Sequence, residues 1–127
     1  MLLPLAGCSG SASVSLAEEQ IPRFHQSLDA AKFQEIYAAA SEELKKASSE
    51  KDFVALLEAV HRKLGAAKSS EKQNWNVGVY TSGTSVSLTY KTVYTEGDAT
   101  EKFVYRIKGD QALLLGYHIS SNALILK

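Results

Sequence analysis

Residues 86–94, Val-Ser-Leu-Thr-Tyr-Lys-Thr-Val-Tyr, alternate large apolar or aromatic side chains with mostly small or polar ones. This period of two is the pattern of a strand that buries one face. Three other segments between residues 74 and 119 share the period, and turns that contain glycine separate them. The second half of the chain therefore predicts a four-stranded antiparallel meander with one apolar face.

Upstream of this region the apolar spacing becomes helical. Ile21, Phe24 and Leu28 form one stripe, and a second stripe continues to Leu44 after a break near residues 29–31. Residues 49–65 predict the clearest helix, with a capping box at its start and a glycine at its end. We expect an α+β fold in which about three N-terminal helices pack on a curved sheet.

Residues paired across neighbouring strands must share a face, and this predicts the turns. Two-residue turns at 82–83 and 97–98 pair apolar residues, and the second sets Glu101 opposite Tyr94. A two-residue turn at 109–110 would reverse the apolar face of the last strand, so we expect a three-residue loop there. The pairings predict one inward row beneath the last helix, made of Trp75, Tyr90, Tyr105 and Leu115.

The composition is that of one ordinary domain of 127 residues. Basic and acidic residues both number 14, and this balance argues against nucleic acid as a partner, because phosphate binding needs a basic surplus. A single cysteine excludes an internal disulfide framework.

Residues 5–8, Leu-Ala-Gly-Cys, match the bacterial lipobox, in which the cysteine receives a lipid. No Lys or Arg precedes Arg23, so we expect a basic, apolar leader upstream of Met1. This motif predicts a membrane anchor at Cys8 and a location on the periplasmic or extracellular face of a bacterial envelope. Three parts are expected: a residual signal and flexible tether over 1–15, one roll domain over 16–121, and a tail over 122–127.

The strand region carries a further pattern. An aromatic-Xaa-Thr-Xaa-aromatic strand at residues 90–94, then Glu101, then Gly-Tyr-His-Ile at 116–119 resemble a small bacterial envelope family, domain of unknown function 4019. Ala112 stands where that family usually has a Trp. The order of elements resembles the cystatin-like or nuclear transport factor 2-like superfamily, and the resemblance implies a roll and no established activity.

Glu101 is the only ionisable carboxylate expected on the inward face. In an enzyme it would act as a desolvated general base in a pocket lined by tyrosines. As a separate possibility, the tyrosines could line a binding pocket for a small apolar or aromatic ligand. The alternative, which the lack of a paired acid or base favours, is a carboxylate at the open end of the sheet that bonds to Tyr94 or faces water. The candidate pocket comprises Trp75, Tyr90, Tyr94, Glu101, Tyr105 and Tyr117.

Other chemistry finds little support. His25, His61 and His118 match no metal-ligand spacing, and the chain has no phosphate-binding loop or other cofactor motif. We therefore expect no metal, no cofactor and no catalytic residue.

A basic cluster is expected on the outward face of the sheet, without acidic residues in the strands. Its members are Lys91, Lys102, Arg106, Lys108 and His118. They would either keep the sheet soluble or bind an anionic partner. Together these features predict a lipid-anchored, non-enzymatic envelope module whose partner is an unknown protein or polymer. The alternatives are a small-ligand-binding roll and, less favoured, an enzyme that uses Glu101.

Overall fold

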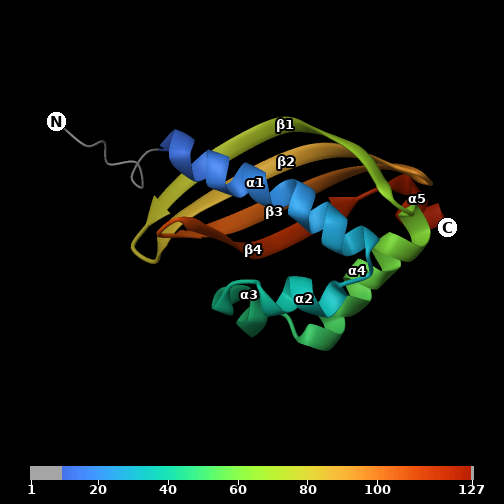
Figure 1. Ribbon diagram of the computed structural model, residues 1–127, viewed down its shortest axis with the longest axis horizontal. Coiled ribbons are helices and arrows are strands. Elements are labelled where there is room, and N and C mark those ends of the chain that lie inside the picture. The colour runs from blue at the N-terminus through green and yellow to red at the C-terminus, as the bar shows by residue number, and fades with distance from the viewer. Residues whose placement is uncertain (1–9, 127) are drawn as a thin grey trace.

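The computed structural model describes residues 10–126 and places helices on one side of a four-stranded antiparallel sheet (Figure 1). The helices are α1 (Gly10–Asp29), α2 (Phe33–Ala38), α3 (Glu42–Ala47), α4 (Glu50–Leu64) and α5 (Asn122–Leu126). The strands are β1 (Ala67–Tyr80), β2 (Gly83–Tyr94), β3 (Gly97–Lys108) and β4 (Gln111–Ser120), adjacent in that order. The predicted α+β order is confirmed, with five helices in the described part instead of about three.

Helix α1 covers the inner face of the sheet and contacts all four strands (Figure 1). Its buried stripe includes Ile21, Phe24 and Leu28, as the spacing predicted. The Phe24 ring lies 5.0 Å from the ring of Phe103, which is completely buried at the centre of β3. Helix α4 packs mainly on α2 and α5, so the prediction that it covers the aromatic row is wrong.

The two ends of the described part, residues 10–126, are more regular than predicted. Residues 10–15 belong to α1, with Ser13 and Val14 buried, so the flexible tether predicted over residues 9–15 is wrong from Gly10 onward. Residues 122–126, predicted as a tail, form α5.

The predicted second helix is two short helices, because β4 fixes a break between them. The Ser41 backbone N–H donates to the Leu114 carbonyl at 2.9 Å, and the Ser41 hydroxyl caps α3 by accepting from Leu44 N–H. Helix α4 has the predicted cap, since Ser49 Oγ accepts from Asp52 N–H at 3.1 Å.

Helix α4 also ends as predicted, at Gly65. Its φ of 79° is in the left-handed region, and a Cβ there would overlap Thr95 Oγ1 at 1.9 Å. Only glycine fits this junction between α4 and β1.

Strand β1 begins at Ala67, seven residues before residue 74, where the first strand was expected to start. The first two turns are displaced from their predicted positions, because Tyr80 pairs with Gly83 and Tyr94 with Gly97. The inward and outward assignment of β2 and β3 survives these shifts, since each moves the register by an even number of residues. Glu101 consequently lies opposite Tyr90, not Tyr94.

The last hairpin has the one extra residue that we predicted, but this residue lies within β4 and not in the loop. Gly109 and Asp110 form a two-residue turn, and the register shifts inside the strand, between the pairs Tyr105–Leu114 and Val104–Gly116. Leu115 is therefore the extra residue of a β-bulge. Leu114 is buried opposite Tyr105, whereas Leu115 was predicted in that place.

Candidate functional site

A buried carboxylate organises the polar part of the core. Glu101, on the inner face of β3, has an exposed fraction of 0%. Its Oε1 accepts from the Thr92 hydroxyl at 2.6 Å, and its Oε2 accepts from the hydroxyls of Tyr94 at 2.7 Å and Tyr117 at 2.5 Å. We call these four residues and His25 the Glu101 network.

His25 reaches this network from α1. Its Nε2 lies 2.8 Å from Glu101 Oε1, and its side chain is only 10% exposed. Sequence reasoning did not assign His25 a role, although a signal was present. Residue 25 is one helical turn after Ile21 and next to Phe24, so it extends the buried stripe of α1.

The environment keeps the carboxylate charged and the tyrosines neutral. Burial alone would raise the pKa of Glu101, but the hydrogen bond and charge of His25 and the hydroxyls of Thr92 and Tyr117 hold that pKa below its usual value. Burial and the adjacent Glu101 charge raise the pKa values of Tyr94 and Tyr117. The two phenols therefore remain hydrogen-bond donors at neutral pH.

Hydrogen bonds within the network occupy the Glu101 carboxylate. Glu101 accepts four hydrogen bonds, about as many as a carboxylate can take. Ser70 Oγ lies 3.0 Å from Thr92 Oγ1 and 3.5 Å from His25 Nδ1. Because Thr92 donates to Glu101, Ser70 is the donor in its bond to Thr92. The expected bond from Tyr94 is present, but the expected position of Glu101 at the open end of the sheet is wrong.

Most of the predicted aromatic pocket is packed core, but Tyr90 and Tyr105 also line hollows beside α1. Tyr90, Tyr105 and Tyr117 surround Phe103 with ring centroids 6.1, 6.4 and 5.2 Å from its own, and Tyr94 is buried with them. Trp75 is not part of this core, since it is 55% exposed on the edge strand β1. The predicted row is absent, because Trp75 pairs with Leu88, Tyr90 pairs with Glu101, and Tyr105 pairs with Val86 and Leu114.

The predicted basic face is more mixed than expected. Arg106 is buried and pairs with Glu43 of α3, with its Nη2 2.6 Å from Glu43 Oε2, so it is removed from that face. The hydrogen bond from Arg106 lowers the pKa of Glu43. The other predicted members remain exposed, namely Lys91, Lys102, Lys108 and His118.

The longer strands also bring acidic residues to this face. Glu71 lies directly opposite Lys91, and Asp98 lies opposite Val93. The expectation of a face without carboxylates is wrong because β1 and β3 both begin earlier than predicted.

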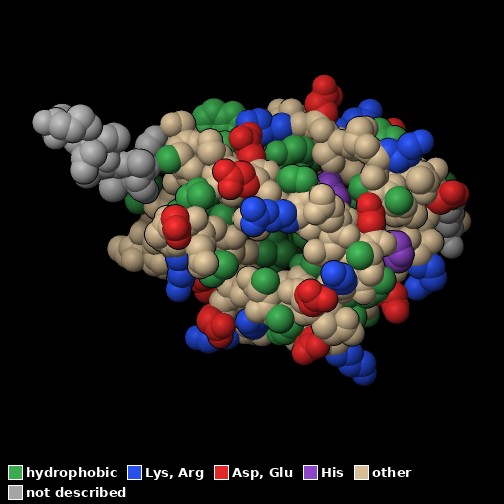
Figure 2. Space-filling model, viewed as in Figure 1, with side chains coloured by type: hydrophobic (Ala, Val, Ile, Leu, Met, Phe, Trp, Pro, Cys, Tyr) green, Lys and Arg blue, Asp and Glu red, His purple; other side chains and the backbone are tan. Residues whose placement is uncertain are grey.

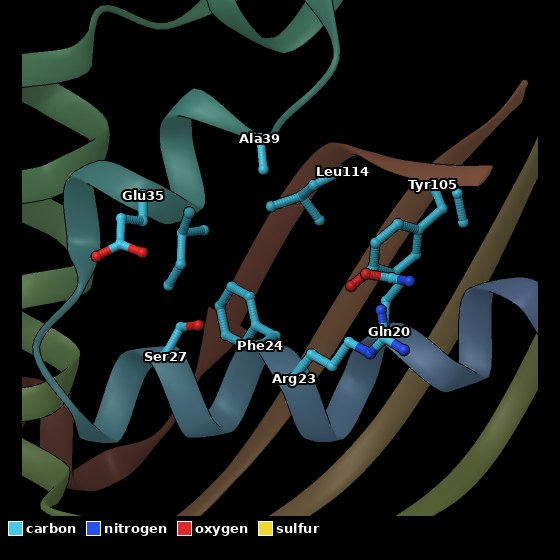
Figure 3. Close-up of a pocket in the computed structure, with 10 residues that line it drawn as sticks. Gln20, Arg23, Phe24, Ser27, Glu35, Ala39, Tyr105 and Leu114 are labelled. Atoms are coloured by element: carbon cyan, nitrogen blue, oxygen red, sulfur yellow. The ribbon is translucent and has the colours of Figure 1, made fainter.

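Two hollows flank α1. The first, here called the α2 cleft, lies between α1, α2 and β4 and has a volume of about 270 Å³ (Figure 3). Phe24, Tyr105 and Leu114 line it together with polar residues of α1 and α2. In the space-filling view, apolar atoms are visible in the depression between these helices (Figure 2). The second hollow lies between α1 and β1, beside His25 and Ser70.

Cys8 and the lipobox residues lie outside the described residues. Within residues 10–126, no helix combines the length and the apolar character needed to cross a membrane.

The residues that carried the sequence resemblance meet in the Glu101 network. Thr92 and Tyr94 come from the aromatic-Xaa-Thr-Xaa-aromatic strand, Glu101 from the next strand and Tyr117 from the closing Gly-Tyr. No curated protein matches the chain. The model of a family described as a protein of unknown function, DUF4019, matches residues 22–117 of the 127-residue chain. Because this match covers most of the chain and includes the entire network, the protein belongs to the DUF4019 family.

Proposed function

We propose that this protein is a non-enzymatic interaction module with a cystatin-like roll, anchored in a bacterial envelope through lipid on Cys8. Its partner is an envelope protein that adds an extended segment to the free edge of β1. The exposed apolar end of β1 is the observation that carries this proposal.

Strand β1 has a neighbour on one side only, β2, along its 14 residues. Three of its large apolar side chains are strongly exposed within six positions: Trp75 at 55%, Val79 at 77% and Tyr80 at 61%. Exposed edges are commonly protected by proline or charge, and residues 74–80 contain neither. An extended peptide can pair with such an edge through its backbone, while aromatic residues supply most of the binding energy.

The polar features of the molecule support binding in preference to catalysis. Glu101 is saturated by internal hydrogen bonds, and Ser70 donates to Thr92. The outward face carries both Lys91 and Glu71, a mixture that gives little attraction to an anionic polymer. The proposal therefore places the partner at the edge of the sheet and not on its outer face.

Photo-crosslinking in intact cells tests this proposal. A photoreactive amino acid replaces Tyr80 in the full chain, and in a matched control it replaces Leu56, an exposed residue of α4. We expect one discrete protein adduct from position 80, which Trp75→Ser/Val79→Lys removes without changing the circular dichroism spectrum. Equal adducts from both positions, no adduct from position 80, or an adduct that survives the double substitution would overturn it.

A further inference from the structure

We infer that the α2 cleft binds a small amphiphilic monoanion, with its carboxylate at Tyr105 and Arg23 and its apolar body on Phe24 and Leu114. This site is separate from the β1 edge and does not depend on the function proposed above. Two hydrogen-bond donors at one end of the cleft, which have no partner within residues 10–126, and the distribution of charge along the cleft carry the inference.

The first of these groups is the Tyr105 hydroxyl. Tyr105 is 3% exposed and lines the cleft, yet its hydroxyl has no hydrogen-bond partner among residues 10–126. Tyr37 and Tyr117 donate to protein acceptors, whereas the Tyr105 hydroxyl, like that of Tyr90, has no acceptor within residues 10–126 and belongs to a side chain that lines a hollow beside α1. The hydroxyl opens on the cleft, so an acceptor atom of a ligand can take its hydrogen bond in place of water.

This hydroxyl is suited to an anion. Burial raises the pKa of Tyr105, so the phenol keeps its proton and acts as a donor. A carboxylate oxygen accepts such a bond more strongly than a neutral oxygen does.

The second group is the Arg23 guanidinium. Within the described residues Arg23 makes no ion pair or hydrogen bond, whereas Arg106 is paired with Glu43. Figure 3 shows Arg23 and Gln20 at the same end of the cleft as Tyr105. Two donors that converge from α1 and β3 on one end form a site for a carboxylate.

The rest of the cleft sets the class of ligand. Phe24 and Leu114 lie in its middle, and Glu35 and Ser27 lie at the end opposite Arg23 (Figure 3). The apolar middle fits an aromatic ring or a short alkyl chain. Glu35 would repel a second negative charge, so a monoanion is preferred over a dianion. The volume of about 270 Å³ is near the lower end for ligand sites and restricts the ligand to a small molecule.

Titration with two matched probes tests the inference. 3-Phenylpropionate carries the carboxylate and 3-phenylpropionamide is its neutral analogue; both are added to the ¹⁵N-labelled domain and followed by amide chemical shifts. We expect saturable binding of the carboxylate, with the largest shifts at cleft residues, and an affinity about tenfold lower for the amide, as the loss of a charge-assisted bond predicts.

Two substitutions assign the contacts. Tyr105→Phe keeps the ring and removes the donor, and Arg23→Gln keeps much of the stem and removes the charge. Each should weaken the binding of 3-phenylpropionate about five- to tenfold, while Arg62→Gln, at an exposed residue of α4, should leave the affinity unchanged. Unchanged amide spectra elsewhere show that each variant is folded.

Three results would overturn the inference. They are the absence of saturable binding by 3-phenylpropionate, equal affinity for the carboxylate and the amide, and shifts centred on Ser70 in the hollow between α1 and β1. Trp75→Ser/Val79→Lys should bind the probe normally, so failure of this site and failure of the β1 interaction are distinguishable.

Discussion

At the scale of single residues, the Glu101 network shows how a sequence pattern can mark a site without revealing its chemistry. The alternation of β2 predicted that Thr92 and Tyr94 point inward, and the structure confirms it. The alternation could not show that a histidine of α1 completes the network, because His25 and Glu101 are separated by 76 positions. Long-range pairing of polar groups depends on how the layers pack.

Removal of the Tyr117 hydroxyl should destabilise the fold. Tyr117→Phe keeps the ring contacts to Phe24 and Phe103 but deletes a donor 2.5 Å from a buried carboxylate. We expect the free energy of unfolding to fall by about 1.5–3 kcal/mol, the range for hydrogen bonds to charged groups, as measured by urea denaturation. Tyr80→Phe, on the exposed end of β1, is the control and should change it by less than about 0.5 kcal/mol.

Stability should depend on pH through Glu101. Its pKa is lower in the folded chain than the ordinary value of about 4.3, so near that pH the unfolded chain binds more protons and the free energy of unfolding rises with pH. The contribution of Glu101 is complete above about pH 5 and is lost as the pH falls through the lowered pKa.

The comparison of Glu101→Gln with the wild type measures this contribution. Urea midpoints between about pH 6 and pH 3 should fall less steeply for Glu101→Gln, whereas Glu19→Gln, an exposed carboxylate of α1, should follow the wild type. Parallel curves for all three proteins would show that Glu101 does not carry the acid sensitivity.

At the scale of elements, the sequence predicts which face of a strand is buried better than it predicts register. The second turn lies at Thr95 and Glu96, not at the Gly97–Asp98 that turn propensity favours. Their backbone N–H groups donate to the carbonyls of Ala66 and Leu64, each at 2.9 Å, so the end of α4 fixes the turn. The local sequence of the turn cannot predict these hydrogen bonds, because their acceptors lie about 30 residues away.

The cap of α4 was correctly predicted and offers a direct test. Ser49→Ala removes the oxygen that accepts from Asp52 N–H. We expect the free energy of unfolding to fall by about 1 kcal/mol in chemical denaturation. The neighbouring Ser48→Ala leaves this cap intact and should have a much smaller effect; equal losses for both would contradict the assignment of the N-cap.

At the scale of the whole molecule, α1 is the element that joins the parts. It covers the sheet, supplies His25 to the network and borders both hollows. The sequence predicted that helices pack on the meander. It also predicted that the helix over residues 49–65 covers the inner face of the sheet, because that helix has the clearest apolar stripe. The choice between two amphipathic helices depends on packing against the whole sheet, which a single stripe does not determine.

The proposed lipid anchor at Cys8 is also a property of the whole molecule, and it can be tested. With an upstream leader restored, the protein should incorporate labelled palmitate and sediment with membranes, because Cys8 would be lipidated. Cys8→Ser should abolish both. Labelling of the Ser variant at the wild-type level would exclude Cys8 as the attachment point.

The start of α1 at Gly10 changes the mechanics of such an anchor. Only Ser9 separates Cys8 from the helix, and the N-terminus of α1 lies at the same end of the molecule as the hairpin of β1 and β2 (Figure 1). A domain anchored at Cys8 would then stay close to the bilayer surface, because one residue gives it little freedom to move away. Encounters at β1 would become a search in two dimensions within a thin layer above the bilayer, where a weak contact is strengthened by high effective concentration. Affinity measured with a freely diffusing domain would underestimate the occupancy reached at the membrane.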